Sequence, residues 1–137
     1  MTDFAQDVSL TLRLHFWLEK DQKIFLGIGR ALLLEKIEEH GSLRQAATDM
    51  KMSYRAAWGK LKAAEESVGR PLVQKVKGRG QRYELTPVGR QLSRQFLQLQ
   101  EDIETFARTK AQELFGEKVQ YYAETYPEGK TPPLKPE

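Results

Sequence analysis

The stretch Gly41–Gln91 reads GSLRQAATDMKMSYRAAWGKLKAAEESVGRPLVQKVKGRGQRYELTPVGRQ, and this stretch decides the fold. Ser42 and Ser53 are residues of the type that caps helices, and each precedes a segment in which apolar residues recur with helical spacing. We expect a short helix ending near Asp49, a tight turn, and a second helix from Ser53 to Val68. Two short apolar strands around a basic, glycine-containing loop then complete the predicted winged helix-turn-helix.

The remaining segments extend this unit at both ends. Ser9–Glu19 alternates apolar and polar residues, which predicts a half-buried strand, and Gln22–Phe25 either extends it or turns back from it. Gly29–His40 is the expected first helix, and Thr86–Phe115 has a cap and an early proline that begin a long last helix. The predicted fold class is mainly α with a small β component: a winged helix-turn-helix plus a long C-terminal dimerisation helix. Its expected parts are a flexible N-terminus (1–8), the winged helix-turn-helix domain with an N-terminal strand (9–86), the dimerisation helix (87–115) and a disordered, proline-containing tail (116–137).

Positive charge is concentrated in one part of the chain. The whole chain has 22 Lys and Arg against 19 Asp and Glu, a net charge of +3. Between Lys51 and Arg82, nine basic residues stand against two acids, Glu65 and Glu66, so this segment carries +7 and the remainder −4. A localised basic segment on a nearly neutral protein is typical of a polyanion-binding protein, although charge alone also fits a solvated basic face.

The helix capped by Ser53 is the expected recognition helix. Four residues share one side of the helical wheel and form its expected buried seam: Ala57, Leu61, Ala64 and Val68. The opposite side carries Arg55, in the first turn, where helix-turn-helix proteins contact bases. Its planar guanidinium can bind guanine O6 and N7 with two hydrogen bonds, so Arg55 is the predicted base-reading residue.

The neighbours of Arg55 on this helix have less specific interpretations. Gly59 in a helix interior costs about 1 kcal/mol relative to alanine, which favours close approach to a groove wall over tight packing of another helix. Lys60 and Lys62 are expected on phosphates. Trp58 is interpreted as a core anchor rather than a residue that stacks on DNA. For Tyr54, both a core position and a hydroxyl contact to phosphate stay open.

The basic loop 75–82 is the expected wing. It contains four cations and no acid: Lys75, Lys77, Arg79 and Arg82. Gly78 and Gly80 permit the positive φ angles that a tight hairpin requires. We expect Lys77 and Arg79 to lie along phosphates or in a narrow minor groove, with a solubilising hairpin as the alternative.

The last helix has an apolar seam with steps of 4, 3, 4 and 3 residues. The seam consists of Leu92, Phe96, Leu99, Ile103 and Phe106. A helix of 29 residues is about 43 Å long, more than one small domain covers, so self-association along this seam is predicted. The alternative is that the seam lies over a strand of its own domain.

Composition excludes several other classes of protein. The chain has no cysteine, which excludes disulfides and thiolate metal sites and fits a cytoplasmic location. It contains no apolar run of membrane-spanning length, and its N-terminus lacks the order of a signal peptide. The only histidines, His15 and His40, stand apart without a carboxylate cluster or nucleophile motif, so we do not expect an enzyme.

Several of these residues also resemble a known family. The order Gly41-Ser42, Ala46-Ala47, Ser53, Leu61, Leu72-Val73 and Leu85-Thr86-Pro87-x-Gly89 resembles the N-terminal domain shared by LysR-type and molybdate-responsive (ModE-type) regulators. Ser53-Tyr54-x-x-Ala57-Trp58, an initial strand and a Gly/Lys-rich wing look like the ModE-type branch. The resemblance covers roughly Leu10–Phe115 and implies a dimeric transcription regulator. ModE-type proteins hold molybdate on C-terminal domains, and the 22 residues after Phe115 do not resemble one, so neither a molybdate site nor another cofactor is expected on this chain.

The sequence therefore predicts a sequence-specific DNA-binding transcription regulator that acts as a homodimer on double-stranded DNA. The alternative is a winged-helix interaction module that pairs with a protein through its long helix. Arg44, in the short helix, is expected to clamp the DNA backbone or to be merely solvated. The full set of expected DNA contacts is Arg44, Ser53, Tyr54, Arg55, Gly59, Lys60, Lys62, Lys75, Lys77, Arg79 and Arg82.

Overall fold

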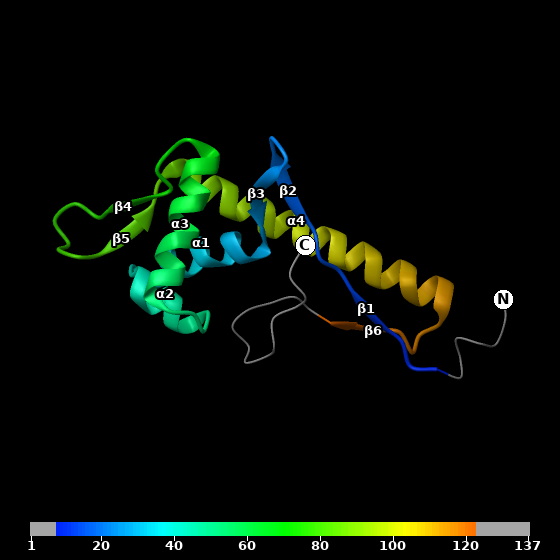
Figure 1. The fold of residues 1–137 in the computed structure, drawn as a ribbon. Coiled ribbons are helices and arrows are strands. Elements are labelled where there is room, and N and C mark those ends of the chain that lie inside the picture. The colour runs from blue at the N-terminus through cyan, green and yellow to red at the C-terminus, as the bar shows by residue number, and fades with distance from the viewer. Residues whose placement is uncertain (1–7, 123–137) are drawn as a thin grey trace.

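The computed structural model describes residues 8–122, and the helix α4 runs along most of its length (Figure 1). In chain order the elements are β1 (Thr11–Arg13), β2 (Trp17–Lys20), β3 (Lys23–Gly27), α1 (Ile28–His40), α2 (Leu43–Asp49), α3 (Tyr54–Val68), β4 (Val73–Lys75), β5 (Tyr83–Leu85), α4 (Pro87–Phe115) and β6 (Gln120–Tyr122). The predicted fold class, mainly α with a small β component, is confirmed. Within residues 8–122 no helix combines the length and the apolar composition that crossing a membrane requires.

The hydrophobic core forms where α1 packs against the other three helices. Leu33, Leu34 and Ile37 of α1 are fully buried, as the helical spacing of the sequence predicts. Leu72, just before β4, and Phe96 of α4 are buried with them. The same core therefore holds the helix-turn-helix, the wing and the first half of α4 together.

Side-chain caps define the starts of three helices. The hydroxyl oxygens of Ser42, Ser53 and Thr86 accept hydrogen bonds from the backbone N–H three residues later, at 3.0, 3.0 and 3.2 Å. Gly41 and Gly69 end α1 and α3 in the left-handed conformation, with φ of 68° and 84°. The predicted bounds of α2, α3 and α4 are confirmed by this geometry.

The prediction of one continuous strand over Ser9–Glu19 was wrong. The segment divides into β1 and β2 because the two halves have different partners: β1 pairs with β6, and β2 pairs antiparallel with β3. Asp21 and Gln22 have φ of 54° and 66°, which makes the reversal between β2 and β3 as tight as a two-residue hairpin turn. The residues after Gln22 therefore turn back rather than extend the strand.

The expected disordered tail is also corrected over its described part. β6 pairs parallel with β1, and the Gln120 N–H donates to the Leu10 carbonyl oxygen at 2.9 Å. Val119 is buried, and its carbonyl accepts a hydrogen bond from the Gln112 side chain of α4 at 3.2 Å. This short apolar segment packs because α4 and β1 together offer it a surface. Residues 1–7 and 123–137, where the flexible N-terminus and the rest of the tail were expected, lie outside the described residues.

Candidate nucleic-acid interface

The buried side of α3 determines which of its other side chains face away from the protein. Ala57, Leu61 and Ala64 are buried and Val68 is half-buried, so the predicted seam packs on α1 and α2. Arg55 on the opposite side is exposed at the N-terminal end of the helix. The structure therefore places the predicted base-reading side chain in the first turn of α3, free of the core.

Gly59 lies on this same exposed side of α3. A Cβ atom added at Gly59 would have no heavy atom within 4 Å outside its own helix. Tight packing of another helix, one of the two interpretations of this glycine, is therefore wrong for the described residues. The open space agrees with the other interpretation, in which an external surface approaches the backbone of α3 at this point.

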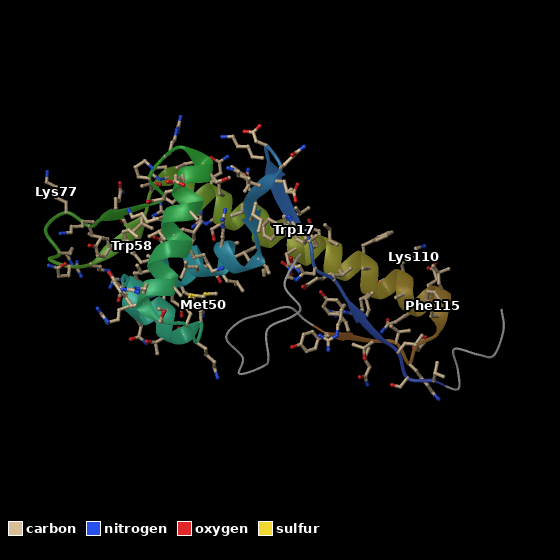
Figure 2. All side chains as sticks on the ribbon, viewed as in Figure 1. Trp17, Met50, Trp58, Lys77, Lys110 and Phe115 are labelled. Atoms are coloured by element: carbon tan, nitrogen blue, oxygen red, sulfur yellow. The ribbon has the colours of Figure 1, made fainter. Side chains whose placement is uncertain are left out.

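The interpretation of Trp58 as a core anchor was wrong. Trp58 lies on the surface of α3 (Figure 2) and is 49% exposed. Tyr54, one turn earlier, is also exposed. Each ring has a cation near its face: the Arg44 guanidinium carbon lies 4.5 Å from the centroid of Tyr54, and the Lys62 Nζ lies 5.5 Å from that of Trp58. The helical wheel places Trp58 at the edge of the buried seam, and neither α2 nor the wing covers that edge.

The two lysines of α3 have different surroundings. Lys62 is exposed and also forms an ion pair with Glu65 at 3.3 Å. Lys60 is half-buried on the other flank, where its Nζ lies 3.7 Å from the Cβ position of Gly29 at the start of α1. The Lys60 amine therefore lies close to the start of α1, and its contact with phosphate stays a prediction.

The wing has the predicted form of a hairpin. β4 and β5 pair antiparallel from Val73 opposite Leu85 to Lys75 opposite Tyr83. Between the strands, Gly78 and Gly80 have φ of 77° and 62°, as the predicted turn requires. Lys75, Lys77 and Arg79 are exposed, and Lys77 lies at the tip of the wing (Figure 2).

Arg82, the fourth cation of the wing, lies at the C-terminal end of α1 instead. Its guanidinium is less than 3 Å from the Cβ position of Gly41 and is 3.5 Å from the His40 carbonyl oxygen, so a cation stands where the helix dipole is negative. The His40 ring hydrogen-bonds the Asp49 carboxylate, and this bond lowers the pKa of Asp49. In this position the Arg82 side chain joins the wing to α1, and because it is also exposed, its contact with DNA stays a prediction.

Glu38 of α1 joins the wing to α4. One carboxylate oxygen accepts the Leu85 N–H at 2.8 Å, and the other accepts from Arg90 Nε at 2.7 Å. Arg90 also donates to the Leu85 carbonyl oxygen at 3.2 Å. The hydrogen bond from Arg90 holds the pKa of Glu38 below its ordinary value, so this carboxyl stays ionised at neutral pH. The base of the wing is therefore fixed relative to α1 and α4.

The predicted apolar seam of α4 divides between two environments. Phe96 is 2% exposed and its ring lies 5.6 Å from that of Phe16, so this member of the seam belongs to the chain's own core. Leu99 and Phe106 are 36% and 66% exposed, and Leu92 and Ile103 are half-buried. The alternative, in which the chain's own domain covers the seam, therefore holds for Phe96 and in part for Leu92, which packs against the core. It does not hold for Leu99 and Phe106.

Taken together, α2 and α3 joined by a tight turn, the β4–β5 hairpin and the caps between them define a winged helix-turn-helix domain. Residues 30–90 match the family described as bacterial regulatory helix-turn-helix protein, lysR family. This segment, somewhat less than half of the chain, is therefore similar to the helix-turn-helix domain of that family.

Individual proteins agree with this assignment. The chain is 35% identical over 72 residues to "Transcriptional regulator ModE" of Haemophilus influenzae, a match that spans 53% of this chain and 26% of that protein. The resemblance to the N-terminal domain of ModE-type regulators is confirmed, although the chain spans only about a quarter of that relative.

Two solved structures share the fold. The crystal structure of a CbnR_DBD–DNA complex has a TM-score of 0.53 at 20% identity and covers 63% of this chain and 99% of that one. A BenM_DBD/benA site 1 DNA complex has a TM-score of 0.55 at 15% identity and covers 66% of this chain and 99% of that one. These likenesses confirm the winged-helix architecture.

Proposed function

We propose that this chain is a transcription regulator that binds double-stranded DNA sequence-specifically as a homodimer. In this proposal α3 enters the major groove, and the wing lies on the backbone or in the minor groove. The observation that carries the proposal is the exposed first half of α3, where Arg55 stands beside the open backbone of Gly59. The relatives support it, since one is named as a transcriptional regulator and the similar structures are DNA complexes.

The arrangement of charge agrees with this function. The wing and the helix-turn-helix occupy the same end of the molecule (Figure 1). Lys77 and Arg79 of the wing and Lys62 of α3 are exposed there. In protein–DNA complexes, exposed cations contact phosphates and fix the register of a helix in the groove, while base contacts supply the sequence information. Selection of duplexes from a random library, followed by protection mapping, tests the proposal directly.

The first expected result concerns Arg55. Arg55→Ala should weaken binding to the selected site by about 1–3 kcal/mol, because a bidentate contact to a guanine edge is lost. Affinity for unrelated duplex DNA should change less. Titration of both duplexes at one salt concentration measures the difference.

Arg70→Ala provides the matched control, since Arg70 is an exposed arginine beyond the other end of α3. We expect its ratio of specific to non-specific affinity to equal that of the wild type. If Arg55→Ala also keeps that ratio, Arg55 does not read a base.

A second expected result concerns the wing. Replacing Lys77 and Arg79 with alanine should weaken binding to every sequence and reduce the slope of log affinity against log salt by up to about 1.8, since each phosphate contact contributes about 0.9. Arg108→Ala with Lys110→Ala removes the same charge from the far part of α4 and should leave the slope unchanged. Equal slopes for the wing variant and the wild type would show that the wing does not contact DNA.

A further inference from the structure

Trp58 and Tyr54 are exposed aromatic residues on a helix whose other exposed side chains are charged or small. The Trp58 indole is half exposed, although aromatic side chains normally contribute most through burial. Trp58 lies one turn after Tyr54 and one turn before Lys62, in the N-terminal half of α3, which also holds Arg55. An uncovered apolar surface therefore lies at the part of the helix that enters DNA in the proposed function.

The surroundings of the ring favour DNA over an apolar protein surface as its partner. Lys62 lies over the Trp58 ring and Arg44 over the Tyr54 ring, so positive charge borders both aromatics. A border of this kind matches phosphates on either side of a groove. The open backbone at Gly59 leaves room for that groove beside the ring.

The chemistry of the major groove narrows the contact further. In a duplex the base faces are stacked on one another, so a side chain on a helix in the groove meets base edges. Among those edges the 5-methyl group of thymine is the apolar one. An indole at the surface of α3 is thus better suited to a thymine methyl than to stacking, which occurs on single strands.

We propose that Trp58, flanked by Tyr54, reads thymine through its 5-methyl group, so that each half-site holds a thymine beside the base that Arg55 contacts. This inference rests on the proposed function, since it requires α3 in the major groove. It assigns α3 two kinds of reading: hydrogen bonding by Arg55 and apolar contact by Trp58.

Replacing thymine by deoxyuridine removes the methyl group and leaves the hydrogen-bonding edge unchanged. In the selected duplex, each thymine of both half-sites is replaced in turn, and the affinity of the wild-type protein is measured. At the position that Trp58 reads, we expect a loss of roughly fourfold per half-site, the effect of burying one methyl-sized group. Trp58→Ala should bind the thymine and uracil duplexes with equal affinity.

Leu18→Ala is the matched control, since Leu18 is an exposed apolar residue on β2, outside α3, and this variant should keep the fourfold ratio. The thermal unfolding temperature of Trp58→Ala should match that of the wild type. If the alanine variant is unstable, the same comparison of thymine and uracil duplexes is made with Trp58→Gln. Wild-type affinity that ignores every uracil, or a Trp58 variant that keeps the thymine preference, would overturn the inference while DNA binding stands. If the wild type selects no duplex at all, the proposed function fails first, before any uracil is introduced, and the inference fails with it.

Discussion

Gly89→Ala is expected to destabilise the fold by roughly 2–4 kcal/mol, because a side chain there meets rigid backbone. A Cβ atom at Gly89 would overlap the Leu72 carbonyl oxygen and lie 3.1 Å from its carbonyl carbon. That carbonyl cannot move freely, since it accepts the Thr86 N–H at 3.0 Å. Denaturant unfolding followed by circular dichroism gives the free energy of unfolding.

Gly59→Ala is the same substitution at a helical site with open space, and it should change the free energy of unfolding in the opposite direction. We expect it to stabilise the fold by about 1 kcal/mol, because alanine is a better helix former than glycine. If DNA approaches α3 closely at this position, the same variant should also bind the selected site more weakly. A Gly89→Ala protein within about 0.5 kcal/mol of the wild type would contradict the packing described here, since surface substitutions stay within that range.

The start of α4 shows what a sequence pattern predicts and what only a fold explains. Thr86 and Pro87 predicted the first turn of the helix correctly, because capping depends on residues close in sequence. Gly89 belonged to the residues that resemble the known family, but nothing in the sequence supplied a physical reason for a glycine at this position. The reason is the Leu72 carbonyl, which lies 17 positions earlier and is brought to Gly89 by the wing.

The burial of Trp58, in contrast, could not be predicted from residues close in sequence. Its wheel position was assigned correctly, at the edge of the buried seam, but burial at an edge depends on which neighbour covers it. That neighbour is determined by the angle between α2 and α3 and by the direction of the wing. The surroundings of Lys60 and Arg82 could not be predicted for a similar reason: long side chains can turn toward the protein or away from it, and local spacing does not decide which.

Prediction of the strands at the two ends was also limited, because the sequence does not show which strands pair. The alternation over Ser9–Glu19 correctly predicted that the apolar residues from Leu10 to Phe16 share a half-buried side. It did not show that β1 and β2 would separate. The β6 segment is three residues long and becomes a strand only by pairing with β1, more than 100 positions earlier. Short strands of this kind have too little local pattern to be predicted from their own residues.

The homodimer leads to the second large expected effect. Leu99 and Phe106 are seven residues apart on α4 and both remain exposed, so a second copy of the chain is the proposed partner for this face. Leu99→Glu combined with Phe106→Glu should give a monomer, because two carboxylates would be buried without a partner in the dimer. Both side chains are accessible in the single chain, so its fold should persist.

Loss of the dimer should weaken binding to a two-fold symmetric site at least about 100-fold, since two linked half-sites gain that much from simultaneous engagement. Binding to an isolated half-site should change little. Sedimentation at micromolar concentration reports the association state, and titration with full-site and half-site duplexes reports the affinity. Gln98→Glu with Thr105→Glu adds two carboxylates at the same spacing to exposed positions on another face of α4, and this control should remain a dimer with wild-type affinity. A wild-type protein that sediments as a monomer, or a Leu99/Phe106 variant that remains a dimer, would show that this face of α4 does not form the dimer.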